Sequence, residues 1–361
     1  MTGEYTGIPV LCERCEHHPV YERKAMKRIV TLVMTLWILL ACPPLSAASE
    51  SDDTSITMAV EFVDHAACAF VAFDREMFRS EGVVIRSHST YATGMALAAA
   101  LTRGDVDAAY ICLVPAINAY ANGKVPLKVV AGTHRYGYGL VVDPRRVSTV
   151  TDLERPDIRL GCPREGSPPD LLVHEMIQRY GLDRDKTLNK IRRMSPPKLL
   201  MALKLGQLDG AFMPEQFSTM GEEMGFTMLV TARDLWPHMQ GSVLVVTEKL
   251  LERHPGIVKK LVTVTTRATA YIAAHPGEAS RIVARWLSVA GGRAGPLTGG
   301  TIPADLDITA EAILRSLTTR LECSTHIDEG EVQKTIHAMA RLGYVEEFDA
   351  SRMLDLRWNH E

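Results

Sequence analysis

From Ile56 onward the sequence alternates short apolar runs with stretches of helical periodicity, and this alternation limits the choice of fold more than any other feature. Extended segments separated by amphipathic helices are typical of largely parallel sheets covered by helices. The strands expected first are residues 56–63, 83–86, 106–111 and 127–131. The helices expected between them are residues 66–81 and 94–103. The fold class is therefore predicted to be α/β.

Two further apolar segments, residues 138–142 and 242–247, bracket a second set of the same kind. Within the bracket the pattern predicts strands at 158–161 and 208–213 and helices at 170–180 and 199–205. After it come predicted helices at 257–274, 309–320 and 329–342. A chain of 361 residues is long enough for two lobes. We expect one lobe from residues 56–141 plus 242–361, and another from residues 142–241.

An internal repeat supports two lobes of similar build. Residues 100–108 have the sequence ALTRGDVDA and residues 202–210 the sequence ALKLGQLDG. In both copies a helix is predicted to end at a glycine, and an aspartate leads into an apolar strand. Glycine is the usual residue after a helix end, so two unrelated turns could also share it. The repeat bears on the fold and not on the ligand.

Residues 26–48 have the layout of a secretory signal. Lys27 and Arg28 precede the apolar run 29–40, which is shorter than the roughly 20 residues that span a bilayer. We therefore expect an exported protein, located in the periplasm or anchored to the outer face of the cytoplasmic membrane. Residues 1–25 fit no export pattern, and we interpret them as an extension from a start codon placed upstream of the true one.

Two cleavage sites compete within this signal. Leu39-Leu40-Ala41-Cys42 resembles the lipobox of bacterial lipoproteins, in which the cysteine is lipidated. Ser46-Ala47-Ala48 offers small residues to an ordinary signal peptidase instead. The sequence leaves the choice between a lipoprotein anchored through Cys42 and a soluble periplasmic protein open.

The net charge limits the partners to be expected, and the cysteine content bears on the disulfides to be expected. A net charge of −3 gives no electrostatic reason to expect nucleic acid. We expect contact with a membrane only through a lipid on Cys42. Four later cysteines, Cys68, Cys112, Cys162 and Cys323, could pair in three ways, and we favour buried free thiols. We expect no cofactor and no metal.

Four sequence segments follow one another along the chain in a characteristic order. They are the repeated Ala-Leu-x-x-Gly-x-x-Asp turn, Asp152-Leu153 before the segment 158–167, the helix start at 169–172 and the segment 243–255. In this they resemble the solute-binding proteins of nitrate, sulfonate and taurine importers and the related thiamine-precursor binders, the NMT1 family. The resemblance covers about residues 56–284. It implies the type-II periplasmic binding protein fold, with two lobes, a hinge and a ligand cleft between the lobes, and it implies an ABC permease and ATPase as partners.

In open α/β sheets, ligands bind beyond the carboxyl ends of strands, so the loops there supply the candidate ligand-binding residues. These are Asp64, His65, Thr90, Tyr91, Thr93, Tyr110 and His134 in the first lobe and Arg164, Ser167 and Glu215 in the second. Thr93 and Ser167 precede predicted helices, where hydroxyl and amide groups either hold an anion or cap the helix. Arg164 is suited to pair with an anionic group, and Tyr91 and Tyr110 either stack on a planar ligand or pack in the core.

The motifs of several enzyme classes are missing from the sequence. It contains no Gly-x-Ser-x-Gly elbow, and His174-Glu175 is followed by Gln178 where a zinc protease needs a second histidine. We predict a non-catalytic protein that captures a small molecule for an importer. A ligand-binding sensor and a thiamine-pyrimidine-precursor binding or synthase-like protein stay open as alternatives. The ligand itself, whether an anion, an amino-sulfonate, a pyrimidine or another metabolite, is not fixed by the sequence.

Overall fold

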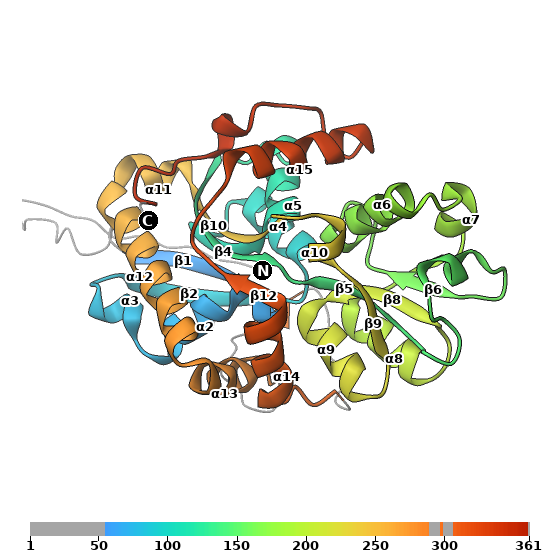
Figure 1. Ribbon diagram of the computed structural model, residues 1–361. Helices are drawn as coiled ribbons and strands as arrows, with labels where there is room; N and C mark the ends of the chain where they lie inside the picture. Colours follow the sequence, from blue (N-terminus) through green and yellow to red (C-terminus); the bar gives the residue numbers. More distant parts are fainter. Residues whose placement is uncertain (1–54, 289–296, 299–305, 360–361) are drawn as a thin grey trace, which may run out of the picture. The chain divides into compact units, whose positions relative to one another are not determined.

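Two β-sheets flanked by helices make up the computed structural model of the protein (Figure 1). The structure describes residues 55–288, 297–298 and 306–359. The expected extension 1–25, the expected signal 26–48 and its Cys42 lie outside the described residues. No helix within those residues is both long enough and apolar enough to cross a membrane. The two mixed sheets confirm the α/β fold class.

The first sheet has seven strands in the order β11-β2-β1-β3-β10-β4-β12. Their bounds are β1 Ser55–Glu61, β2 Val84–Tyr91, β3 Ala108–Cys112, β4 Leu127–Tyr136, β10 Gln240–Thr247, β11 Leu297–Thr298 and β12 Leu321–Cys323. The helices around it are α2 Ala67–Asp74, α3 Met77–Ser80, α4 Gly94–Arg103, α5 Leu113–Ala121, α11 Glu248–Arg253, α12 Pro255–Ala274 and α13 Pro276–Leu287. Strand β1 pairs in parallel with β2 and β3, and β10 runs antiparallel between β3 and β4. We call this sheet and these helices the first lobe.

The second sheet has five strands in the order β7-β6-β8-β5-β9. Their bounds are β5 Tyr138–Val142, β6 Leu160–Cys162, β7 Ile191–Arg193, β8 Gly210–Pro214 and β9 Thr227–Thr231. The helices around it are α6 Pro168–Tyr180, α7 Arg184–Leu188, α8 Pro196–Lys204, α9 Glu215–Glu223 and α10 Ala232–Leu235. We call this sheet and these helices the second lobe. Because β5 pairs with β8 and β9, the boundary expected after residue 141 falls inside a strand, and the chain changes sheets earlier, at Gly137.

The two sheets are joined by two short crossings, residues 136–137 and residues 238–239, which we call the hinge. Tyr136, Gly137 and His238 all have positive φ, at 64°, 87° and 69°. The crossings are tied together, since the amide of Tyr136 donates to the carbonyl of Met239 at 3.0 Å. Gly137 is needed for space as well, because a Cβ there would lie 2.6 Å from His65 Nε2 and from Leu321 Cδ2. The hinge is therefore a tightly packed pair of turns.

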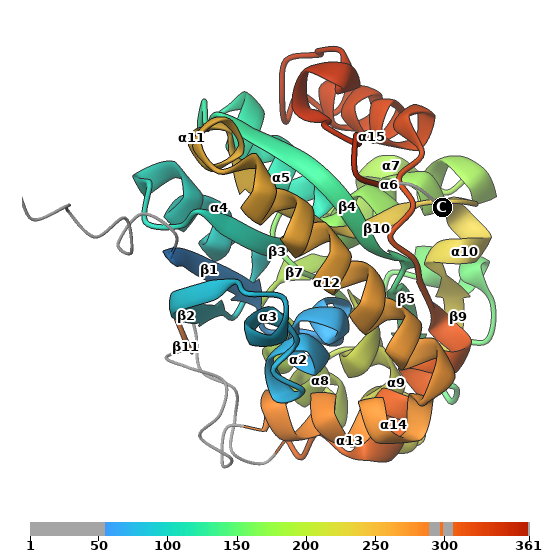
Figure 2. The same cartoon turned by 90° about the vertical axis from the view of Figure 1, so that its left-hand side faces the viewer.

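The C-terminal part of the chain contacts both lobes. It contains α14 Ala310–Arg315, a π-helical turn Ser316–Arg320, β12 and α15 Glu329–Arg341. Figures 1 and 2 show α15 lying over α5 and reaching toward α6. On the first lobe, Asn122 Nδ2 donates to the carbonyl of Tyr344 at 2.8 Å. On the second, the Tyr344 hydroxyl donates to Asp170 Oδ2 at 2.6 Å.

The repeated turns make the same contact in both lobes. Asp107 Oδ2 accepts from the amide of Thr57, and Asp209 Oδ2 accepts from the amide of Arg159, each at 2.8 Å. The amide of each aspartate in turn donates to the carbonyl of the same partner. Each aspartate therefore ties the start of its own strand to the start of the neighbouring parallel strand. The predicted similarity of the two turns is confirmed.

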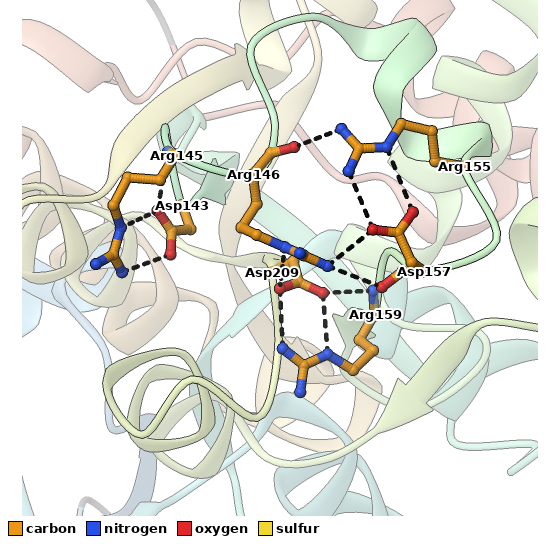
Figure 3. Close-up of polar contacts among 7 residues, drawn as sticks. All are labelled: Asp143, Arg145, Arg146, Arg155, Asp157, Arg159 and Asp209. Atoms are coloured by element: carbon orange, nitrogen blue, oxygen red, sulfur yellow. Dashed lines mark hydrogen bonds and ion pairs between the residues drawn. The ribbon is translucent and has the colours of Figure 1, made fainter.

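Around Asp209 this contact grows into a network of ion pairs (Figure 3). Its members are Arg146, Arg155, Asp157, Arg159 and Asp209, with the pair Asp143 and Arg145 beside them. Arg159 holds Asp209 through two guanidinium nitrogens, at 2.9 and 3.0 Å. The network lies at the starts of β6 and β8, the edge of the second sheet away from the loops that follow those strands.

Several element boundaries differ from the expected ones. Strand β2 runs on to Tyr91, well past the expected end at residue 86. The helix expected over 66–81 is broken where Glu76 adopts a left-handed conformation, with φ 53°, between α2 and α3. Helices α5 and α9 start directly after β3 and β8, so the loops expected there are absent. The longer β2 moves the candidate residues Thr90 and Tyr91 out of the expected loop.

Candidate functional site

A cavity of about 470 Å³, which we call the cleft, opens between the two lobes. Its first-lobe wall is formed where β1, β2 and β3 end, and its second-lobe wall where β6, β7 and β8 end. Most of the lining is apolar. Its polar and charged side chains are Glu61, Thr93, Cys112, Tyr138, Arg164, Ser167, Arg193 and Ser195. A concave, mostly apolar site with a few polar groups at the carboxyl ends of strands is the usual form of a small-molecule site.

Glu61 is the acidic residue of the cleft wall. It ends β1, and its two carboxylate oxygens are held separately. Oε1 accepts from the amide of Gly94 at 2.8 Å, and Oε2 accepts from the amide of Cys112 at 3.0 Å. Burial raises the pKa of Glu61 above its ordinary value, while the hydrogen bonds from Cys112 and Gly94 act in the opposite direction. The carboxylate is thus fixed in position at the beginning of α4 and of α5.

Arg193, at the end of β7, is the paired guanidinium of the opposite wall. Its Nη1 lies 2.7 Å from Asp170 Oδ1 and donates to the carbonyl of Pro163 at 2.9 Å. Asp170 is fully buried and also accepts from the amide of Gly166 at 3.1 Å and from Tyr344. A buried carboxylate needs this many partners, because an unpaired one would be costly to bury. Arg193 is therefore a neutralised, oriented part of the wall.

Arg164 and Ser167 lie in the loop between β6 and α6 and have no such partners. Arg164 is exposed and forms no ion pair with any described residue. Ser167 is only 6 % exposed, and among the described residues its Oγ has no hydrogen-bond partner. Buried polar atoms are almost always hydrogen-bonded, so an unpartnered hydroxyl in a cavity wall is a candidate ligand contact.

Cys112 and His65 form a neutral pair behind the first-lobe wall. His65 Nε2 lies 2.6 Å from the carbonyl of Gly137 and therefore carries the proton, which leaves Nδ1 as the acceptor 3.6 Å from Cys112 Sγ. Tyr138 and Ser242 donate to the same sulfur at 3.0 and 3.3 Å. Burial raises the pKa of Cys112 and lowers the pKa of His65 well below its usual value. The thiol and the imidazole are both uncharged at neutral pH.

Two buried acids lie beside the hinge. Asp64 receives a short hydrogen bond from Ser316, and burial raises its pKa to about 7. Glu215 accepts from Thr219 Oγ1 at 2.7 Å, and burial raises its pKa to about 8. The amide of Glu215 donates to the carbonyl of Gly137, the same oxygen that His65 contacts. Glu215 faces a separate polar cavity of about 420 Å³.

The structure brings three of the candidate residues together in the cleft: Thr93, Arg164 and Ser167. It places Asp64, His65, His134 and Glu215 at or beside the hinge. Thr90 and Tyr91 are buried within β2. Tyr110 lies in the core, where its hydroxyl contacts Thr265 Oγ1 at 2.8 Å. Thr90 and Tyr91 are absent from the cleft wall because β2 extends further than expected, and Tyr110 is absent because its side chain is buried in the core.

Sequence reasoning overlooked Glu61, Cys112, Tyr138 and Arg193. Glu61 had a signal of its own, since it is the only charged residue in the apolar run ITMAVEFV. A charge in a buried strand needs specific partners and often marks a site. Arg193 had no comparable signal, because its neighbours are Arg192 and Met194 on a short, half-buried strand. The described residues contain no cluster of histidine, cysteine and acidic side chains able to hold a metal ion.

Comparison with solved structures identifies the fold. The chain superposes on the ligand-binding component of an ABC-type import system from Staphylococcus aureus with a TM-score of 0.69 and 15% identity, covering 84% of this chain and 97% of that one. The alkanesulfonate-binding protein SsuA from Xanthomonas axonopodis pv. citri, bound to MOPS, superposes with a TM-score of 0.67 and 14% identity, covering 84% of this chain and 98% of that one. The nitrate-binding protein NrtA from Synechocystis PCC 6803 superposes with a TM-score of 0.65 and 12% identity, covering 85% of this chain and 86% of that one. The chain therefore has the periplasmic binding protein fold.

None of the curated protein sequences matches the chain. The sequence pattern of the NMT1-like family matches residues 49–288, which include the hinge, the second lobe and the first lobe apart from β11 and β12. This confirms the resemblance found in the sequence, and the chain belongs to the NMT1-like family.

Proposed function

We propose that this protein is the extracytoplasmic solute-binding component of an ABC importer, which captures a small molecule in the cleft and delivers it to a permease and its ATPase. The observation that carries the proposal is the cleft between two lobes that are joined by short crossings. A ligand in such a cleft touches both walls and favours the arrangement in which the walls are close. Hinge closure around a ligand is the motion that this architecture supports.

The side chains of the cleft support a binding role rather than catalysis. Cys112 is its nucleophilic residue, and its thiol is kept neutral by burial. Cysteine reacts as the thiolate, so a thiol with a raised pKa is a poor nucleophile. His65, which would have to take its proton, has a lowered pKa for the same reason. We therefore infer that the protein releases its ligand unchanged.

The importer role fits the expected export of the protein. A lipid on Cys42, or release into the periplasm, would keep the cleft beside a permease in the cytoplasmic membrane. The partners that we propose are the small-molecule ligand, the permease and the ATPase. We propose neither nucleic acid nor a cofactor. Uptake and transcription assays in a deletion strain separate this role from that of a sensor. Loss of transcriptional signalling with intact uptake would contradict the importer role.

Blocking the cleft tests the proposal on the purified protein. Ala92 is half-buried in the cleft wall, whereas Ala99 is exposed on the outside of α4. We expect a panel of small amines, amino acids, pyrimidines, sulfonates and nitrate to contain a compound that raises the melting temperature without being consumed. Ala92→Trp should abolish that rise, and Ala99→Trp should leave it intact. A ligand present at 100 times its dissociation constant stabilises the folded state by about 2.7 kcal/mol, which is easily measured.

A further inference from the structure

The first-lobe wall of the cleft presents a carboxylate at the place where the sequence suggests an anion site. Thr93 and Gly94 stand at the start of α4, where a free hydroxyl and a free amide would suit a negative group. Both groups are already used. Thr93 Oγ1 accepts from the amide of Ala96 at 3.2 Å, and the amide of Gly94 donates to Glu61 at 2.8 Å. An anion entering here would meet Glu61 in place of free donors.

The fit of Glu61 against Gly94 is close. A Cβ at residue 94 would lie 3.0 and 3.1 Å from the two carboxylate oxygens and 2.6 Å from Pro115 Cγ. The amide of Cys112 holds the second oxygen at 3.0 Å. The side chain is therefore built into the wall and does not swing freely. In its ionised form this carboxylate repels a nitrate, sulfonate or carboxylate group strongly, because the site is partly desolvated.

A carboxylate offers about four acceptor positions, and those of Glu61 are used by the amides of Gly94 and Cys112 and by the side chain of Cys112. Glu61 lines the cleft, so its remaining acceptor capacity is available to a ligand there. A ligand group that uses this capacity must donate a hydrogen bond. A cationic amine or amidine does this best, because a charge-assisted hydrogen bond is about twice as strong as a neutral one.

The second-lobe wall of the cleft presents hydrogen-bond donors in place of a carboxylate. Asp170 neutralises Arg193, but no described carboxylate pairs with Arg164. Ser167 adds a buried hydroxyl without a described partner. The rest of the lining is mostly apolar, with Met95 on the first-lobe wall and Phe217 on the second-lobe wall. The cleft thus has an acceptor on one wall, donors on the other and an otherwise mostly apolar lining.

We infer that the ligand is a small dipolar molecule, with an amine or amidine group against Glu61, an apolar body, and a carboxylate or other acceptor group against Arg164 and Ser167. This rests on the proposed function, since it concerns the same cleft. The inferred ligand carries an amine or amidine and so differs from the nitrate that names the nitrate-binding protein of the same fold.

The test uses probes that share one body and differ in charge: 4-(aminomethyl)benzoate, benzylamine and benzoate, together with leucine, phenylalanine, ethanesulfonate and nitrate. Binding is measured by calorimetry and by thermal shift on the purified protein. We expect an amine-bearing probe to bind about tenfold or more tightly than its anionic counterpart. Glu61→Gln should lower the affinity for the amine-bearing probes by about tenfold or more and should not lower the affinity for benzoate. Arg164→Gln should lower the affinity for the dipolar probes and leave the affinity for benzylamine unchanged.

Glu252→Gln is the matched control, because Glu252 is an exposed acid on α11 that does not line the cleft. It should change no affinity. If Glu61→Gln lowers the melting temperature, the inference is still tested by the relative affinities of the wild-type protein for the probes and by the affinities of the Arg164→Gln variant. Tight binding of nitrate or ethanesulfonate, with no binding of the amines, would overturn the ligand class and leave the importer function standing. Binding of no probe, in the wild type or in any variant, would count against both.

Discussion

The hydroxyl of Tyr344, near the C-terminus, donates a hydrogen bond of 2.6 Å to the buried carboxylate of Asp170 in the second lobe. Asp170 also holds Arg193, which forms part of the cleft wall. The ring of Tyr344 lies against Gly166, where an added Cβ would be 3.7 Å from it. The C-terminal segment therefore supports the back of the ligand site across the gap between the lobes.

Removing that hydroxyl should loosen the segment. We expect Tyr344→Phe to lower the free energy of unfolding by about 1–2 kcal/mol, because a buried charged acceptor loses one of its donors. Urea unfolding followed by circular dichroism measures this change. Tyr180→Phe is the control, since Tyr180 is 42% exposed, and its effect should stay within about 0.5 kcal/mol. Equal effects of the two substitutions would show that the contact with Asp170 adds nothing.

The buried acids at the hinge predict a loss of stability at alkaline pH. Asp64 and Glu215 have pKa values raised to about 7 and about 8, so they are protonated in the folded state at pH values where the unfolded chain has lost these protons. Their stabilising contribution is complete below the unfolded pKa near 4 and is lost as the pH rises through about 7 and 8. His134, with its pKa lowered to about 4, acts in the opposite sense between pH 4 and about 6.5. His65 also has a lowered pKa and opposes the acids as the pH rises toward about 6.5.

These opposing effects leave a net fall in the free energy of unfolding from about pH 6.5 to pH 8, of up to about 1.4 kcal/mol per pH unit for each acid. Urea titrations across that range measure the slope. Glu215→Gln keeps an oxygen for Thr219 and should remove the share of the slope due to Glu215, which is the larger share above pH 7 because Asp64 titrates at about 7. Asp152→Asn is the control, because hydrogen bonds from the amides of Ser148 and Thr149 lower the pKa of Asp152 to about 2 and it stays ionised throughout. A slope unchanged by Glu215→Gln would refute the assignment.

The hinge glycine should tolerate no side chain. Gly137→Ala forces a Cβ to 2.6 Å from His65 Nε2 and from Leu321 Cδ2, at a φ of 87°. We expect a loss of about 2 kcal/mol or more in the free energy of unfolding. Gly181→Ala has a similar φ, 64°, but no atom within 4 Å of the new Cβ, so it measures the backbone cost alone. That cost is about 1 kcal/mol. Similar losses for both variants would mean that packing at the hinge is loose.

The thiol in the cleft should be unreactive in the native protein. Burial keeps Cys112 in its neutral form, and the side chain is only 3% exposed. Iodoacetamide at pH 8 should therefore label Cys112 at less than about a tenth of the rate seen in urea, as measured by mass spectrometry of the peptide. The same experiment checks the four described cysteines, which are free thiols in the structure, as favoured from the sequence. Rapid native labelling of Cys112 would revive an enzymatic role.

Hydrophobic periodicity was enough to predict the architecture. The α/β class follows from segments such as 242–247, whose apolar pattern matches β10, and from the glycine that ends α4. The boundaries were less accessible, because a strand does not end where its apolar pattern ends. Polar residues such as His88 and Ser89 continue β2 through its backbone pairing with β1. The periodicity of a sequence reflects which side chains are buried and not which backbone groups are hydrogen-bonded. The predicted end of β2 and the predicted position of Tyr91 were therefore wrong.

The cleft could be predicted only in part. The residues next to α4 and α6, Thr93 and Ser167, were found because helix starts have a sequence signature. Glu61 and Cys112 come from strands that are adjacent only in the folded sheet, and their contact depends on the register between β1 and β3. The pairing of Arg193 with Asp170 likewise joins a strand to a helix that is distant in the chain. Such contacts belong to tertiary structure.

The matched turns at Asp107 and Asp209 have a consequence for loop-closure entropy. Each aspartate bonds a residue 50 positions earlier in the chain, Thr57 in one sheet and Arg159 in the other. Since the entropy of closing a loop depends on its length, the two closures cost the same. The loss of stability in Asp107→Asn and in Asp209→Asn then differs by what the partners add, the hydroxyl of Thr57 in the first sheet and the guanidinium groups of Arg159 and Arg146 in the second. The comparison within one chain therefore measures what the ion pairs of Asp209 contribute beyond a neutral hydrogen bond.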